Sequence, residues 1–250
     1  MPSGPPLVTP GERMTYRVEL KGFELASYTF AVGEPTELAG RQVIPVEGHT
    51  RNTGLAKSIT KVDDRFTSWI DVATGRSVRF QTTEYATGSD TNIEHSIMDL
   101  AGRDGDTIPV SFQLNDGAPE AQPQLVTQAE IWDYNTLLVM LRAWEAPAGT
   151  ATSLEVFRSR FLWKIDVRVH GKESLVTALG ELPALRFDAH ATKLDRKGGK
   201  FPDTPERDFS IWISDDDGRV PLQTTAETDY GNIKMEIVDY QPGIGARLRP

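Results

Sequence analysis

The sequence predicts an all-β fold in which a strongly curved or twisted, mainly antiparallel sheet wraps around one buried helix. Two observations lead to this prediction. Apolar and polar residues alternate along most of the chain, whereas one segment, 134–144, spaces its apolar residues with the period of a helix. Because successive side chains of a strand point to opposite faces, alternation gives each strand one dry and one solvated face, which is typical of antiparallel sheets.

Strands are expected wherever this alternation persists. It is clearest over 13–20, 161–170 and 233–237, where every second residue is apolar. Weaker stretches of the same kind predict strands at 25–32, 42–49, 57–62, 66–71, 77–85, 92–98, 108–113, 185–192, 209–214 and 221–228. Short turn segments separate most of them, so strands that follow one another in the chain are expected to pair as a meander.

Turns are expected where glycine or paired acidic residues interrupt the alternation, at 21–22, 63–64, 74–75, 170–172 and 215–218. In the last of these, Gly218 is free to adopt a positive φ, which suits a hairpin. Two longer segments, 115–124 and 194–206, are rich in residues that disfavour regular structure and are expected to be exposed loops.

The helix is expected over about 133–145. Asp133 is a suitable N-cap, because its carboxylate can accept a hydrogen bond from an unpaired backbone N–H of the first turn. The residues of one helix face are spaced i, i+3, i+4 and i+7, namely Tyr134, Leu137, Leu138 and Leu141. The opposite face is also largely apolar, so the helix must be mostly buried, and we place it across the concave face of the sheet.

These elements form one expected domain over 11–240. A proline-rich, flexible leader precedes it over 1–10, and an aperiodic tail follows it over 241–250. The leader lacks a basic region followed by an apolar core, so it is not a signal peptide. Two histories fit this start: a cytoplasmic protein with a frayed end, or an exported protein whose signal has been removed.

Composition excludes several classes of protein. The formal net charge of −9 argues against a nucleic-acid partner, because phosphate contacts need clustered Lys and Arg. No apolar run approaches the roughly 20 residues that a membrane-spanning helix needs, so the chain is not expected to span a membrane. With no cysteine, the chain has no disulfide, thiolate ligand or thiol nucleophile.

No motif for catalysis or metal binding stands out, so we predict no catalytic residue, no metal ligand and no cofactor. Both G-x-S-x-G and H-E-x-x-H are missing, and the four histidines lie far apart without metal-ligand spacing: His49, His95, His170 and His190. Asp215, Asp216 and Asp217 are contiguous, unlike the alternate ligands of a calcium loop. Carboxylates that converge from different strands, as in glycoside hydrolases, stay open as an alternative, although no particular pair is indicated.

The five tryptophans suggest a ligand site. Trp144, Trp163 and Trp212 could line a hydrophobic groove on the concave face, suited to an acyl chain or an extended peptide. The alternative is that the helix and its neighbours simply cover Trp212. Arg142, alone among apolar helix residues, is expected either to extend to the surface or to anchor an anion at the mouth of the groove.

Four stretches resemble, in order, the bacterial domain-of-unknown-function 3108 family. They are Gly11–Tyr16, Asp133–Leu138 with Leu141-Arg142, Leu179–Leu182 with Ala184–Arg186, and Ile211–Asp216 with Arg219–Leu222 and Gly231–Ile233. The resemblance implies an exported protein of Gram-negative bacteria, periplasmic or lipid-anchored at the outer membrane, with no assigned catalytic residues. The family is similar to an envelope group that folds as a β-spiral, an open, barrel-like sheet curled around a helix. Segment 99–128 does not align.

From these observations we expect a non-enzymatic periplasmic or cell-envelope protein. Its concave face would bind a hydrophobic ligand or a partner peptide, and the protein would be a monomer. One alternative is a structural or interaction module that docks another envelope protein without a ligand. A further alternative is a hydrolase that uses convergent acidic residues.

Overall fold

The structure is a computed structural model that describes residues 2–53, 62–85, 92–229 and 231–249. Its helix is α1 (Tyr134–Ala143). The strands are β1 (Arg13–Leu20), β2 (Phe23–Val32), β3 (Thr36–Leu38), β4 (Arg41–Asn52), β5 (Asp63–Asp71), β6 (Ser77–Tyr85), β7 (Ile93–Met98), β8 (Thr107–Ile108), β9 (Val110–Leu114), β10 (Glu120–Ala121), β11 (Gln124–Leu125), β12 (Ile131–Asp133), β13 (Ala151–Arg158), β14 (Phe161–Thr177), β15 (Gly180–Lys193), β16 (Arg207–Ser214), β17 (Pro221–Thr228) and β18 (Gly231–Gln241).

Nearly all strands belong to one sheet, in the order β10-β9-β7-β6-β5-β4-β2-β1-β18-β17-β16-β15-β14-β13-β12, and β3 pairs with β4. Strands that follow one another in the chain are mostly neighbours, so the predicted meander is confirmed. The first and last long strands, β1 and β18, pair antiparallel and join the two halves of the sheet. Among the described residues β10 and β12 stay unpaired with each other, so the sheet is not closed into a barrel.

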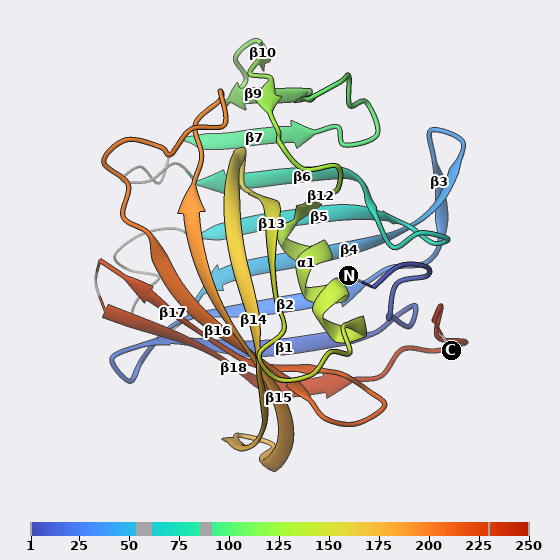
Figure 1. Cartoon of the computed structure of the whole chain (residues 1–250), viewed down its shortest axis with the longest axis vertical. Helices are drawn as coiled ribbons and strands as arrows, with labels where there is room; N and C mark the ends of the chain where they lie inside the picture. The colour runs from blue at the N-terminus through green and yellow to red at the C-terminus, as the bar shows by residue number, and fades with distance from the viewer. Residues whose placement is uncertain (1, 54–61, 86–91, 230, 250) are drawn as a thin grey trace.

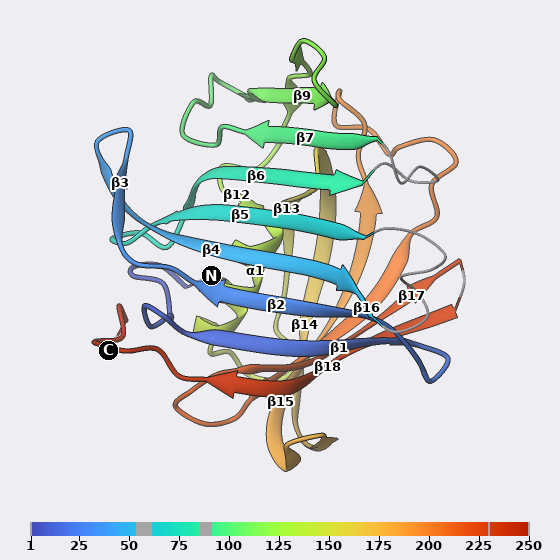
Figure 2. The ribbon, with the colours of Figure 1, turned by 180° about the vertical axis from the view of Figure 1, so that it is seen from behind.

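The sheet curls around α1. In Figure 1 the C-terminal strands β13–β16 cross in front of the N-terminal strands, with α1 beside them. Figure 2, seen from behind, shows β1, β2 and β4–β7 stacked on the side that faces the viewer. The helix lies in the concave space between these halves, and its residues from Asn135 to Arg142 are buried. The predicted fold, a strongly curved antiparallel sheet around one buried helix, is therefore confirmed.

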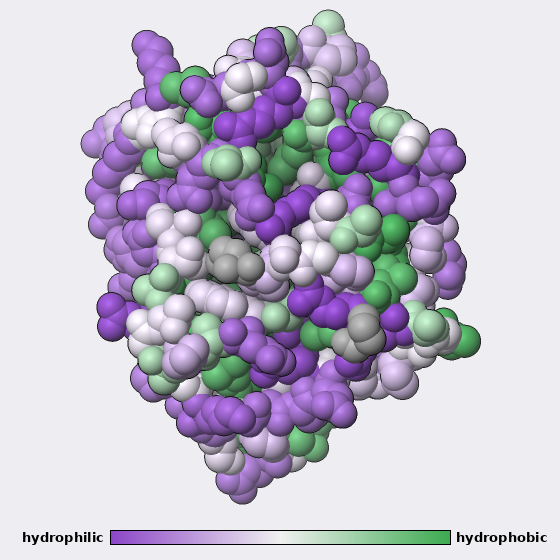
Figure 3. All heavy atoms as spheres, turned by 45° about the vertical axis from the view of Figure 1, so that its right-hand side comes forward, coloured by the Kyte–Doolittle hydropathy of each residue, from purple (hydrophilic) through white to green (hydrophobic). Residues whose placement is uncertain are grey.

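The core follows from this arrangement. The larger hydrophobic cluster joins the inner faces of both sheet halves to the helix, through residues such as Met14, Phe30, Leu141 and Ile237. A second cluster around Phe80 and Phe157 lies near the β6–β10 edge. The outer surface is mostly hydrophilic, and Figure 3 shows hydrophobic side chains on one face as scattered patches between polar ones.

Strand β13 shows where alternation fails as a signal, because it was not among the predicted strands. Leu154 and Val156 are buried, but so are Glu155 and Phe157 on the other face. Glu155 accepts hydrogen bonds from the backbone N–H groups of Thr127 and Gln128 and from the Thr127 hydroxyl. A strand that is buried on both faces has no polar side to reveal its period.

Two predicted turns are wrong. Residues 170–172 lie inside β14, where the register with β15 shifts at Gly171, whose φ is 136°. A glycine within a strand marks such a bulge as readily as a turn. Asp63 and Asp64 belong to β5 rather than to a turn, because they pair in register with Arg51 and Thr50 of β4.

The β16–β17 turn and the N-terminal leader also differ from expectation, and one expected strand lies mostly outside the described residues. In the β16–β17 turn Arg219, not Gly218, takes the positive φ, at 48°. The leader, expected to be flexible, is packed: Val8 is fully buried and its carbonyl accepts a hydrogen bond from the Leu248 N–H of the tail. Most of the strand expected at 57–62 falls within 54–61, which the structure does not describe.

Candidate functional site: a cavity under the curved sheet

The N-terminal end of α1 is fixed by a buried carboxyl group. Asp133 caps the helix as predicted, accepting from the backbone N–H of Thr136 at 2.9 Å. The hydroxyls of Ser68 in β5, Ser77 in β6 and Thr136 also donate to it. Burial raises the pKa of Asp133, while these hydrogen bonds act in the opposite direction. This end of the helix is therefore held against the N-terminal half of the sheet.

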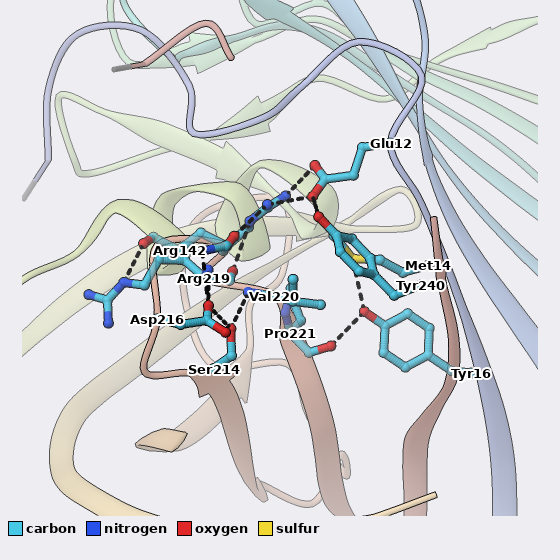
Figure 4. A network of polar contacts seen from close by, with 11 residues as sticks. Glu12, Met14, Tyr16, Arg142, Ser214, Asp216, Arg219, Val220, Pro221 and Tyr240 are labelled. Carbon is cyan, nitrogen blue, oxygen red and sulfur yellow. Dashed lines mark hydrogen bonds and ion pairs between the residues drawn. The ribbon is translucent and has the colours of Figure 1, made fainter. Parts of the chain in front are cut away.

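The C-terminal end of α1 is fixed by an ion pair. Arg142 donates to both carboxylate oxygens of Glu12, at 2.8 and 2.7 Å, and the Tyr240 hydroxyl donates to the same carboxylate (Figure 4). The Arg142 side chain also donates to the backbone carbonyls of Gly218 and Arg219. Burial, followed by the charge of Glu12, raises the pKa of Tyr240 to about 12.

The expectation that Arg142 extends to the surface is wrong. Its side chain and that of Glu12 are both 2% exposed. Four of its N–H groups donate to Glu12 and to backbone carbonyls, so the side chain serves to hold the helix. Arg219 adds to the attachment, because its guanidinium donates hydrogen bonds to the backbone carbonyls of Arg142 and Trp144 at the end of the helix.

An apolar cavity of about 490 Å³ lies between α1 and the inner faces of both sheet halves. Residues from the helix and from both halves line it, among them Val18, Phe66, Leu138, Ile165, Phe209 and Met235. The helix has only 10 residues and is too short to fill the whole concave space of the sheet. The part that it does not fill is this cavity.

The structure brings one of the three candidate tryptophans to this cavity. Trp163 lines it. Trp144 is buried elsewhere in the core, stacked on Phe187 with ring centroids 5.6 Å apart. Trp212 lies on the opposite face from Phe209, where its indole N–H donates to Glu173. Whether Trp163 contacts a ligand stays a prediction, and Trp144 and Trp212 lie outside the cavity wall.

Charged residues at the cavity were not predicted. Asp64 and Glu84, from neighbouring strands, line it, and so do Arg158 and Arg207. Burial raises the pKa of both carboxyls, while Arg158 and the hydrogen bonds from Tyr85 N–H to Asp64 and from Ser159 to Glu84 act in the opposite direction. The sequence could have indicated Asp64, because residues 64 and 66 of one strand project to the same face, and Phe66 is one of the apolar residues of that face.

Three of the four histidines are paired with acidic residues of neighbouring strands, and the fourth, His95, is hydrogen-bonded to the hydroxyl of Thr83. His170 lies 2.8 Å from Asp188, and His190 lies 2.7 Å from Asp208. His49 is paired in the same way with Asp63. In the part of the chain that the structure describes, no group of three or more potential ligands could hold a metal ion.

No described helix is long and apolar enough to cross a membrane.

The fold and the cavity define a class: an all-β protein with an open, barrel-like sheet curled around an internal helix. Within that class, the chain belongs to the DUF3108 family of proteins of unknown function, whose family model matches residues 15–238. The family membership indicated by the four sequence stretches is thus confirmed. A search of the curated proteins gives no match.

One of the similar solved structures shares the fold, and two more distant ones are similar over nearly the whole chain. A β-barrel-like protein of the domain of unknown function DUF1849 from Brucella abortus has a TM-score of 0.56 at 12% identity, covering 94% of this chain and 98% of that one. A Bacteroides fragilis protein, described as a candidate exported protein with a YmcC-like fold, has 0.44 at 7% identity, covering 96% and 100%. A candidate lipoprotein from Parabacteroides distasonis has 0.42 at 8%, covering 95% and 99%.

Proposed function

We propose that this protein is a non-enzymatic protein of the cell envelope that binds a hydrophobic ligand in the cavity beneath its curved sheet. The observation that supports the proposal is the cavity itself. Its volume of about 490 Å³ lies within the range of small-molecule sites, roughly 300–1,000 Å³. Its wall combines aliphatic and aromatic side chains with a few charged and polar groups, which is the usual composition of such sites.

The test is to fill the cavity. Ala191 lines it and is 5% exposed, so Ala191→Trp would place an indole in the open space. We expect the wild type to bind the neutral fluorescent probe N-phenyl-1-naphthylamine, and the variant to bind it at least about tenfold more weakly. Ala151→Trp, at an exposed position at the start of β13, is the matched control and should bind like the wild type. Equal binding by all three proteins, or no binding by the wild type, would count against the proposal.

The envelope location is part of the proposal and has its own support and test. The family resemblance of the sequence implies export. Fractionation of cells that produce the protein from its natural reading frame should place it in the periplasm or with the outer membrane, and recovery in the cytoplasm would contradict the location. Native mass spectrometry of that material would reveal a co-purified ligand as an added mass.

A second candidate function, hydrolysis by acid–base chemistry, is favoured by one observation. Asp64 and Glu84 both face the cavity, and burial raises the pKa of each. Perturbed carboxyl groups in a cleft are typical of catalytic acids and bases, although structural networks perturb them as well. Turnover of chromogenic glycosides or esters that is lost in both Asp64→Asn and Glu84→Gln would support hydrolysis, and absence of turnover in the wild type would exclude these substrates.

A further inference from the structure

Two cations stand at the edge of the cavity on neighbouring hairpins. Arg158, at the end of β13, lines the cavity directly. Lys193, at the end of β15, pairs in register with Trp163 of β14, which also lines the cavity. Directly paired residues of antiparallel strands project to the same face of the sheet. Lys193 therefore lies on the concave face beside Trp163.

Neither side chain is held by a direct ion pair in the described part of the chain. Within the described residues the side chains of Arg158 and Lys193 donate no hydrogen bond and form no ion pair, although the charge of Arg158 acts on the nearby carboxyls of Asp64 and Glu84. The Lys193 ammonium instead lies 3.5 Å from the ring centre of Phe161 and 4.2 Å from that of Phe201. These ring faces attract the ammonium but provide no oxygen or nitrogen acceptor for its N–H donors. By contrast, Arg207, the other cation of the cavity wall, is paired with Asp229 at 2.8 Å.

The cations also repel one another. Burial lowers the pKa of Lys193, and the nearby charges of Arg160, Arg158 and Arg196 lower it further. Such a concentration of positive charge is notable in a chain with a net charge of −9. An anion placed among these groups would relieve the repulsion and accept hydrogen bonds from donors that are otherwise unused within the described residues.

Two carboxyl groups, Asp64 and Glu84, lie near Arg158, but they oppose an anion less than their formal charge suggests. Burial favours the neutral form of both Asp64 and Glu84. Each carboxyl also accepts a hydrogen bond from the protein, Asp64 from the Tyr85 N–H and Glu84 from the Ser159 hydroxyl.

We propose that the ligand of the cavity is a single-chain amphiphile with an anionic head group, a carboxylate or a phosphate, held at the cavity edge by Arg158 and Lys193. The apolar chain occupies the space between α1 and the sheet, and the head group accepts hydrogen bonds from the two cations. This inference rests on the proposed function, since the chain of the amphiphile is the hydrophobic ligand.

The test compares head groups on one apolar chain. Dodecanoate, dodecyl phosphate and 1-dodecanol, each below its micelle concentration, are used to displace N-phenyl-1-naphthylamine from the wild type. We expect either anion to bind about tenfold more tightly than the alcohol, because charge-assisted hydrogen bonds are roughly twice as strong as neutral ones. Inorganic phosphate alone should displace nothing; displacement by it would show that a free anion, rather than an amphiphile, is the ligand and would overturn the proposal.

Substitution of the cations tests the assignment of residues. Lys193→Met and Arg158→Met should each bring the affinity for dodecanoate toward that for dodecanol, compared within the same variant. Lys197→Met, at an exposed lysine of the β15–β16 connection, is the matched control and should retain the preference for the anions. Retention of that preference in both Lys193→Met and Arg158→Met would overturn the assignment.

The outcomes separate this inference from the proposed function. If the wild type binds the neutral probe and dodecanol as tightly as the anions, the head-group inference fails and the hydrophobic cavity function stands. If the wild type binds neither the neutral probe nor any of the amphiphiles, both fail.

Discussion

The two ends of helix α1 are fixed in the sheet by different chemistry. At the N-terminal end, Asp133 is surrounded by neutral donors from β5, β6 and the first helical turn. At the C-terminal end, Arg142 and Glu12 form a bidentate ion pair. The first end attaches the helix to the middle of the N-terminal half of the sheet, and the second attaches it to the residue before β1, near the junction of the halves.

This difference in chemistry determines how much stability is lost when one interaction partner at either end of the helix is removed. A buried ion pair adds little net stability over an apolar pair, but removing one partner leaves an uncompensated charge in a medium of low polarity. The carboxyl of Asp133 can become neutral through protonation, and its hydroxyl partners lose one acceptor each. We therefore expect the ionic end to be the more sensitive to single substitutions.

The largest effect is expected from Arg142→Met. This change leaves the Glu12 carboxylate buried with Tyr240 as its remaining side-chain partner and removes the donors to the β16–β17 turn. We expect the free energy of unfolding to fall by about 3–5 kcal/mol, measured by urea denaturation at neutral pH.

The double variant Glu12→Leu/Arg142→Met provides the control, because it replaces the pair with apolar groups of similar size. It should be markedly more stable than Arg142→Met alone. Equal stability of the single and double variants would show that packing of the long side chain, and not the unpaired carboxylate, accounts for the loss.

The two helix ends also show which contacts can be predicted from the sequence and which cannot. Asp133 could be predicted, because an N-cap contacts the N–H of a residue three positions later. The partner of Arg142 could not, because Glu12 lies 130 positions away and nothing local couples the two. An arginine on an apolar helix is usually placed at the surface, and its burial here depends on a carboxylate that the three-dimensional fold supplies.

The same holds for the cavity: the sequence predicts which residues share a face, but not which part of that face stays open. Alternation correctly grouped Phe209 and Ile211 on the face opposite Trp212, and both line the cavity. Which part of the concave face stays open depends on how far α1 and Trp144 fill it, and no periodic pattern records that. Lys193 was likewise missed, because its place beside Trp163 follows from the register between β14 and β15.

The second largest effect is expected at the neutral end of the helix. Asp133→Ala removes the N-cap and leaves the hydroxyls of Ser68, Ser77 and Thr136 without this acceptor. We expect a loss of about 2 kcal/mol by urea denaturation, less than for Arg142→Met. A loss that exceeds the effect of Arg142→Met would reverse the proposed ranking of the two ends.

The pH dependence of the Asp133→Asn variant sharpens the comparison further. Because the folded-state pKa of Asp133 is raised, the folded state holds a proton that the unfolded state releases above the ordinary pKa of an aspartate, 3.8. The contribution of Asp133 to stability therefore falls as the pH rises from that value through the folded-state pKa. The wild type should be most stable relative to Asp133→Asn at about pH 4, and the difference should shrink toward neutral pH. A pH-independent difference would contradict the raised pKa.

The smallest effect is expected at an exposed pair, which gives the scale for the buried ones. Asp208 and Glu206 flank His190 on the outer face, and the hydrogen bond with Asp208, followed by the nearby charges, raises the pKa of His190. The stabilisation is complete below the unfolded value of 6.5 and is lost as the pH rises through the folded-state pKa. His190→Gln should therefore cost a few tenths of a kcal/mol at about pH 5.5, since solvent screens the pair, and nothing at about pH 9. In an Asp208→Asn background this pH dependence should largely disappear; a cost as large as that of Arg142→Met would mean that burial is not what separates strong from weak ion pairs in this protein.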